Sequence, residues 1–181
     1  TLWSKTTMSA LRLINETTAS SVASVSVTDI FTSDFDIYKI VINDYQSATS
    51  QELAMRFVNS SGSVVSASNY DRATLFLRSY NTFQEGRATS ADKIEALGFN
   101  SATTVGFGLT LYVFNPNSSS SYSFVLSQTS SDVSGSGNIN YKAIGVLKQT
   151  ASMSGLNFFG ASGHNLTSIN IKTYGLRVDN G

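Results

Sequence analysis

The stretch DIYKIVINDYQSATSQELAMRFVN, residues 36–59, decides the fold of this chain. Apolar residues alternate with polar ones in both of its halves, at Tyr38, Ile40 and Ile42 and again at Leu53, Met55 and Phe57. A period of two with β-branched and aromatic residues is typical of half-buried strands. The linker between the halves, residues 46–50, is short and polar, which predicts an antiparallel hairpin. We expect the six apolar side chains to share one buried layer.

Similar alternating segments occur on both sides of this hairpin, separated by turn residues at fairly even spacing. They predict further strands over residues 11–17, 21–28, 63–70, 72–80, 105–115, 122–128, 138–148, 153–159 and 168–178. Many short strands at this spacing are typical of a sandwich or barrel. The fold class is therefore expected to be an all-β, antiparallel β-sandwich of jelly-roll type. No linker or internal repeat divides it, which predicts one domain over residues 1–181, with residues 1–10 as an N-terminal extension.

Three stretches are expected to depart from regular strands. Residues 81–98 favour a loop with a short extended piece, and a short helix after Ser90, ended by Gly98, is the alternative. Residues 130–137 are rich in Ser and Gly and predict a loop. Near Thr173 the apolar positions change parity along the last strand, which predicts a β-bulge beside Gly175.

Composition excludes several classes of protein. Charged residues make up 13% of the chain, about half of the usual ~25%, and the 12 basic and 12 acidic residues cancel. The sequence shows no excess of basic residues that would attract nucleic acid or an anionic membrane. No apolar run approaches the ~20 residues of a membrane-spanning helix. The absence of cysteine excludes disulfides, thiol nucleophiles and cysteine-ligated metals.

Side chains for catalysis or metal binding are sparse. His164 is the one histidine and lies in a Gly-rich segment that lacks the nucleophile-elbow pattern, so we expect an exposed loop residue. Four aspartates near one predicted corner lack calcium-loop spacing: Asp29, Asp34, Asp36 and Asp44. The carboxylates of Glu85, Asp92 and Glu95 have no spacing specific to glycoside hydrolysis. We therefore predict no enzyme activity, no cofactor and no metal.

Aromatic residues offer the main candidates for ligand contact. Trp3, Tyr70, Tyr80 and Phe83 have flat apolar rings that could stack on sugars, although core packing or an oligomer contact is the commoner role. Among them, Tyr70 and Tyr80 are the candidate glycan contacts.

The predicted strand over residues 105–115 has two apolar faces. One face, formed by Val105, Phe107, Leu109, Leu111 and Val113, should be core. The other carries Gly106 and Gly108, which permit close approach, and the large aromatics Tyr112 and Phe114. Because an outward face is usually polar, residues 81–104 or a neighbouring subunit should cover those aromatics. Tyr112 and Phe114 are therefore the candidate contacts of a homo-oligomer.

The order of several motifs resembles a segment common in structural proteins of tailed-bacteriophage virions. An F-x-S-x-[YF]-D-x-Y-x-I motif and an L-x-[ML]-R-F strand are present, followed by an S-x-Y turn, at Phe31, Ser33, Phe35, Asp36, Tyr38, Ile40, Leu53, Met55, Arg56, Phe57 and Tyr70. Downstream, LYVFNP at residues 111–116 and IKTYGLR at residues 171–177 resemble the same family's strand-then-NP and YGL endings.

This resemblance implies a component of the virion surface: a head decoration protein, or a fibre or baseplate module. Its partners would be copies of itself in a homotrimer, other virion proteins such as the major capsid protein, and host surface glycans. It implies no catalytic residue, and the composition predicts no nucleic-acid or membrane partner. The alternative is a carbohydrate-binding module or lectin on the same fold, since a fold does not determine function.

Overall fold

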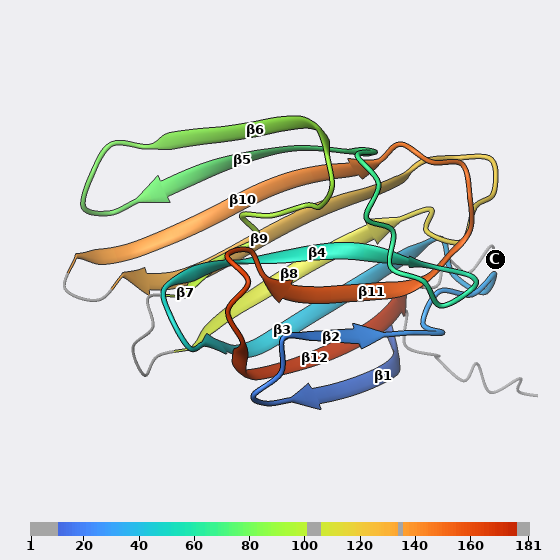
Figure 1. Cartoon of the computed structure of the whole chain (residues 1–181), viewed down its shortest axis with the longest axis horizontal. Helices are drawn as coiled ribbons and strands as arrows, with labels where there is room; N and C mark the ends of the chain where they lie inside the picture. The colour runs from blue at the N-terminus through green and yellow to red at the C-terminus, as the bar shows by residue number, and fades with distance from the viewer. Residues whose placement is uncertain (1–10, 101–105, 134–135, 177–181) are drawn as a thin grey trace, which may run out of the picture.

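Within the residues that the structure describes, twelve strands form two antiparallel sheets (Figure 1). The computed structural model describes residues 11–100, 106–133 and 136–176. Eight strands form the larger sheet, in the order β1 (Leu11–Ala19), β12 (Leu166–Leu176), β3 (Ile37–Ser47), β8 (Phe107–Phe114), β9 (Ser123–Val133), β10 (Gly137–Leu147), β5 (Tyr70–Arg78) and β6 (Gln84–Ala91). Four form the smaller sheet, in the order β2 (Ser24–Val27), β11 (Met153–Gly160), β4 (Gln51–Asn59) and β7 (Phe99–Asn100).

The two sheets pack face to face, so the predicted all-β, antiparallel sandwich is confirmed. The jelly-roll subtype stays a prediction. The predicted N-terminal extension, residues 1–10, and Trp3 with it, lies outside the described residues. The described part of the chain contains no helix long and apolar enough to cross a membrane.

The central pair of strands does not form the predicted hairpin. β3 pairs with β12 and β8 in the larger sheet, whereas β4 pairs with β11 and β7 in the smaller one. Residues 48–50 carry the chain from one sheet to the other. The hairpin prediction was wrong because two strands facing each other across a sandwich show the same apolar alternation as two hydrogen-bonded neighbours.

The predicted buried layer is confirmed. All six of its apolar side chains have no exposed surface: Tyr38, Ile40, Ile42, Leu53, Met55 and Phe57. The first three come from β3 and the others from β4, so the layer joins the inner faces of both sheets. The Tyr38 hydroxyl accepts a hydrogen bond from the backbone N–H of Thr32 (2.7 Å) and donates one to its carbonyl (2.8 Å).

The pairing of β1 with β12 is irregular between Leu13 and Asn15, opposite Tyr174 and Thr173. The predicted bulge in β12 itself, beside Gly175, is absent, because β12 pairs regularly with β3 from Asn170 to Leu176. Register shifts occur earlier in the strand, between Leu166 and Asn170. Gly175 lies on the inner face, where an added Cβ would be 2.5 Å from the Phe35 ring. Tyr174 and Leu176 therefore point outward, and the apparent change of parity marks an apolar outer face.

The ambiguous residues 81–98 form an edge strand and an irregular segment. β6 pairs with β5, which makes this part more extended than predicted, and the short helix is wrong. Residues 92–98, here called the strap, return along the free edge of β4. Backbone hydrogen bonds join Met55 to Ile94 in both directions (2.8 and 3.0 Å) and Leu53 to Gly98 (2.8 Å). The strap thus closes the sandwich over the inner face of β5 and β10.

Two smaller expectations also fail. Residues 63–69 are irregular, with one isolated bridge between Val58 and Val64, instead of a strand. The side-chain oxygen of Asn59 accepts hydrogen bonds from the backbone N–H groups of Ser61 and Ser63 (3.0 and 2.9 Å). These bonds take backbone donors that a regular strand would use for pairing. In addition, β9 extends to Val133 through the expected Ser-rich loop, because its small polar side chains alternate inward and outward.

Candidate functional site

The candidate site is the outer face of the eight-stranded sheet, which points away from the smaller sheet. Directly opposite residues of antiparallel neighbours lie on the same face of a sheet. The printed register therefore defines rows of side chains that cross the outer face perpendicular to the strands.

One of these rows is apolar across six neighbouring strands. We call it the apolar row, and it consists of Leu11, Leu176, Ile37, Phe114, Phe124 and Val146. Outer faces of antiparallel sheets normally carry polar side chains. Phe124 nevertheless has 46% of its surface exposed.

The next two rows change gradually from apolar to charged. The mixed row consists of Leu13, Tyr174, Lys39, Tyr112, Leu126, Ile144, Ala73 and Arg87. The polar row consists of Glu16, Lys172, Val41, Thr110, Gln128, Lys142, Leu75 and Glu85. The outer face is thus apolar at one end of its strands and polar toward the other.

Most of the exposed large apolar side chains of the described residues gather on this face. They are Leu11, Leu13, Leu75, Phe124, Leu126 and Ile144, and Ile144 is the most exposed of them at 56%. Contiguous apolar patches of this kind are uncommon on monomers and mark sites of interaction.

Tyr112 and Phe114 lie on this face, as the sequence predicted, and both are half-buried. The described part of residues 81–104 does not cover them. β6 pairs at the far edge of the sheet, and the strap lies on the inner side. Val105 is outside the described residues, as are 101–104. The described residues therefore give no cover for Tyr112 and Phe114, and coverage by a neighbouring subunit stays a prediction.

Gly106, just before β8, and Gly108, within it, were both expected to allow close approach of another segment to the outer face. Only one of them does so. An added Cβ at Gly106 would lie 3.0 Å from the backbone of Asp44 in the same chain. Asp44 sits at the irregular end of β3 with a positive φ of 55°. Gly106 therefore accommodates β3, and only Gly108 remains open toward the outer face.

Three hollows on the outer face were not predicted. An apolar hollow of about 660 Å³ lies over β9, β10 and β5, lined chiefly by Ala73, Phe124, Leu126, Ile144 and Val146. A second hollow of about 570 Å³ lies over β3, β8, β9 and β10, between Lys39 and Lys142, and is here called the lysine groove. A third hollow of about 480 Å³ lies over β10, β5 and β6, and its lining includes Lys142, Leu75 and Glu85. Sequence reasoning missed all three because their residues come from strands whose order and register depend on long-range pairing.

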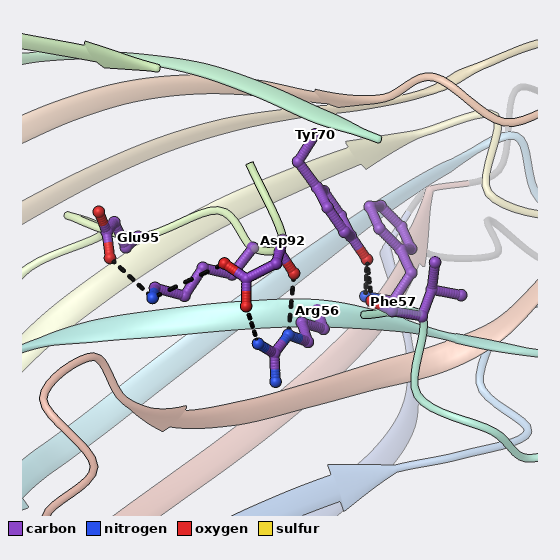
Figure 2. Close-up of polar contacts among 7 residues, drawn as sticks. Arg56, Phe57, Tyr70, Asp92 and Glu95 are labelled. Carbon is purple, nitrogen blue, oxygen red and sulfur yellow. Dashed lines mark hydrogen bonds and ion pairs between the residues drawn. The ribbon is translucent and has the colours of Figure 1, made fainter. Parts of the chain in front are cut away.

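Tyr70 cannot be a glycan contact, because none of its surface is exposed. Its hydroxyl accepts from the backbone N–H of Phe57 (3.0 Å) and donates to the Val65 carbonyl (2.8 Å), as Figure 2 shows for Phe57. Burial raises the pKa of Tyr70 to about 12. Tyr80 is 38% exposed and follows β5, so its role as a glycan contact stays a prediction, but the structure does not bring the two tyrosines together.

We expect the Tyr70→Phe variant to lose about 1–3 kcal/mol of unfolding free energy, because a buried N–H and a buried carbonyl lose their partner. Tyr80→Phe is the matched control, since its exposed hydroxyl should contribute less than about 0.5 kcal/mol. Urea denaturation of both variants measures the difference. Equal stability of the two would contradict the bridging role of the Tyr70 hydroxyl.

Two of the three predicted carboxylates, Asp92 and Glu95, are held in ion pairs. Figure 2 shows the pair of Asp92 with Arg56. Asp92 and Glu95 of the strap pair with Arg56 of β4 and Arg72 of β5, respectively. Lys93 lies 3.3 Å from Glu95. Glu85 lies apart on the exposed edge strand. In the described residues, Asp92 and Glu95 therefore attach the strap to β4 and β5 and do not form a pair of free carboxylates.

The pKa values of two carboxyl groups near the strap shift in opposite directions. Burial would raise the pKa of Asp92, but the hydrogen bond from Arg56 and the charges of Lys93 and Arg56 outweigh it, so the pKa is lowered. Burial raises the pKa of Glu52, and the negative charge of Glu95 adds to this effect. The folded state therefore favours ionised Asp92 and protonated Glu52.

This opposition predicts opposite pH dependence for two variants. Asp92 contributes stability above its ordinary pKa of 3.8 that is lost as the pH falls through its lower folded pKa. Glu52 contributes stability below its ordinary pKa of 4.5 that is lost as the pH rises through its higher folded pKa. At about pH 7, Asp92→Asn should destabilise and Glu52→Gln should stabilise, each by up to about 1 kcal/mol. Denaturation at about pH 7 and about pH 3 tests this, and shifts of the same sign at neutral pH would contradict it.

The remaining chemical candidates are not brought together. His164 is exposed in the turn between β11 and β12, as expected, and its carbonyl accepts from the Gln51 side chain (3.0 Å). Asp29, Asp34, Asp36 and Asp44 are exposed. No group of three or more His, Asp or Glu side chains within the described ranges could hold a metal ion.

No protein-family model and no curated protein sequence matches this chain. Two solved structures show a faint likeness: a β-fructofuranosidase from Schwanniomyces occidentalis complexed with fructosyl-erythritol, and a substituted form of that enzyme complexed with fructosylnystose. Each is 12% identical over 93% of this chain, with TM-scores of 0.28 and 0.27. The chain spans 35% of the length of each. At these values the likeness carries no argument about activity.

Proposed function

We propose that this chain is a structural protein on the surface of a bacteriophage virion, of the capsid-decoration or fibre type. It acts by binding and not by catalysis. The observation that carries this proposal is the apolar row on the outer face of a sheet that no described strand covers. The resemblance to phage structural proteins supplies the biological setting.

The occupant of the apolar row is a second copy of the chain. Phe114 and Phe124 of this row, with Ile144 of the neighbouring mixed row, offer large apolar surfaces whose burial stabilises association. The equal numbers of acidic and basic residues give little electrostatic repulsion between copies. Self-association usually closes with point-group symmetry, and the phage resemblance favours a homotrimer. Attachment to the major capsid protein would use a different surface.

Quantitative mass spectrometry of gradient-purified particles tests the virion assignment. The proposal predicts that the chain copurifies with the particles, at a fixed and symmetric ratio to the major capsid protein. Its absence from infectious particles, with recovery only in the free protein fraction, would contradict the proposal.

A further inference from the structure

The lysine groove has the composition of a site for an anion. Its outward side chains are Lys39, Lys142, Tyr112, Thr110, Gln128 and Leu126. The lining includes no aspartate or glutamate. Two positive charges therefore border a polar floor at the centre of the outer face.

Neither lysine is neutralised within the described part of the chain. No carboxylate there forms an ion pair with Lys39 or Lys142. Other lysines on or beside this face differ. Lys172 lies 3.4 Å from Glu16, and Lys148 lies 2.9 Å from Asp71. Glu85 lines a neighbouring hollow together with Lys142, but the two form no ion pair. The groove thus keeps a positive charge that a negatively charged ligand would complement.

The spacing of the lysines suits an extended ligand. Lys39 is on β3 and Lys142 is on β10, with β8 and β9 between them. Three steps between strands place the two backbones roughly 14 Å apart. A single small anion cannot contact both ammonium groups at their full separation, whereas a chain of several linked units can lie across the floor.

The floor favours a saccharide as this extended ligand. Thr110 and Gln128 face each other across β8 and β9 and offer hydroxyl and amide groups that both donate and accept hydrogen bonds. Tyr112 adds an aromatic ring with a phenol, a combination that suits a sugar's apolar C–H surface and its hydroxyls. An acidic peptide would also complement the two lysines, but it offers no flat C–H face of a sugar ring to the Tyr112 ring.

We propose that the lysine groove binds a carboxylated oligosaccharide, with Lys39 and Lys142 contacting carboxylates and Thr110, Gln128 and Tyr112 contacting the sugar rings. The groove occupies the mixed and polar rows and lies beside the apolar row. The proposal therefore goes beyond the assembly function. It assigns Tyr112 to the saccharide and leaves the subunit contact to Phe114 and the apolar row. It also places the glycan contact on the outer face instead of at the buried Tyr70.

Isothermal titration calorimetry with trigalacturonic acid tests the proposal, and its fully methyl-esterified form is the neutral control ligand. Wild-type protein should bind the acid with a Kd of about 1 mM or tighter. The ester should bind about tenfold more weakly or worse, because its carbonyls carry no charge for the lysines. Added salt should weaken binding of the acid.

Matched variants locate the site. The Lys39→Gln/Lys142→Gln double variant should lose about tenfold or more in affinity for the acid. Lys172→Gln should keep the wild-type affinity, since Lys172 lies on the same face but outside the groove. Thermal unfolding checks that the variants are folded, and the comparison of acid with ester needs only the wild-type protein.

Several results would overturn the proposal. These are equal affinity for acid and ester, no heat of binding at about 10 mM acid, or unchanged affinity in the folded double variant. Tighter binding of a tri-aspartate peptide than of the trisaccharide would also overturn it, because the groove would then be a site for acidic peptides.

Discussion

Replacement of Ile40 by alanine is expected to lower the free energy of unfolding by about 2–5 kcal/mol. Ile40 has no exposed surface and lies at the centre of β3, where β12 and β8 flank it with Thr173 and Leu111 as its direct partners. Its side chain faces the smaller sheet, so truncation leaves a cavity that both sheets would have to close.

Lys39→Ala is the matched control for this prediction. Lys39 is the neighbouring residue of the same strand, but it lies on the outer face, so its loss should change stability by less than about 0.5 kcal/mol. Urea denaturation of the two variants, with the same slope as wild type, measures the difference. Similar losses in both would mean that the assignment of inner and outer faces is incorrect.

The inner faces of the central strands could be predicted from sequence, but their partners could not. The period of two places Ile40 and Met55 in the core whatever their strands pair with. Pairing depends on contacts between distant segments: β3 lies beside β12, which follows it by more than one hundred residues. A link as short as residues 48–50 can connect two strands of a hairpin or two strands in different sheets, so its length did not distinguish these arrangements.

The errors in the later strands share one physical cause. Tyr174 and Leu176 are apolar, and the predicted bulge was needed only to turn them inward. In the structure they stay outward, because the outer face is itself apolar at their end of β12. Leu75 of β5 also points outward, although it lies in the polar row. A rule that places apolar residues inside fails where a surface is built for contact.

The candidate site was predicted in part. Tyr112 and Phe114 were recognised because they stand opposite a core face on one strand. Phe124 and Ile144, which continue the patch, could not be recognised, because their proximity to Tyr112 and Phe114 depends on the register of β9 and β10. Tyr70 was misassigned because its hydroxyl finds backbone partners that only the fold brings near.

The second large effect is expected from charging the apolar row. The Phe114→Lys/Phe124→Lys variant replaces two directly paired side chains of β8 and β9 with lysines. If each aromatic contributes about 2 kcal/mol to an interface, the loss of both should weaken self-association about 1,000-fold. The variant should stay folded, since both side chains point away from the core.

A Tyr80→Lys/Phe83→Lys variant is the matched control. Tyr80 and Phe83 are exposed aromatics, at 38% and 65%, in the connection between β5 and β6. They lie outside the apolar row, so the same change of side chains and charge should leave self-association unaffected. A general effect of added positive charge would instead weaken both variants equally.

Sedimentation equilibrium of the wild type and these two variants at micromolar concentration tests the central claim most directly. The account predicts a wild-type mass that is a multiple of the 19.4 kDa chain, the same multiple for Tyr80→Lys/Phe83→Lys, and a folded monomer for Phe114→Lys/Phe124→Lys. A monomeric wild type, or a folded Phe114→Lys/Phe124→Lys variant that keeps the wild-type mass, would contradict the claim that the apolar row is the assembly surface.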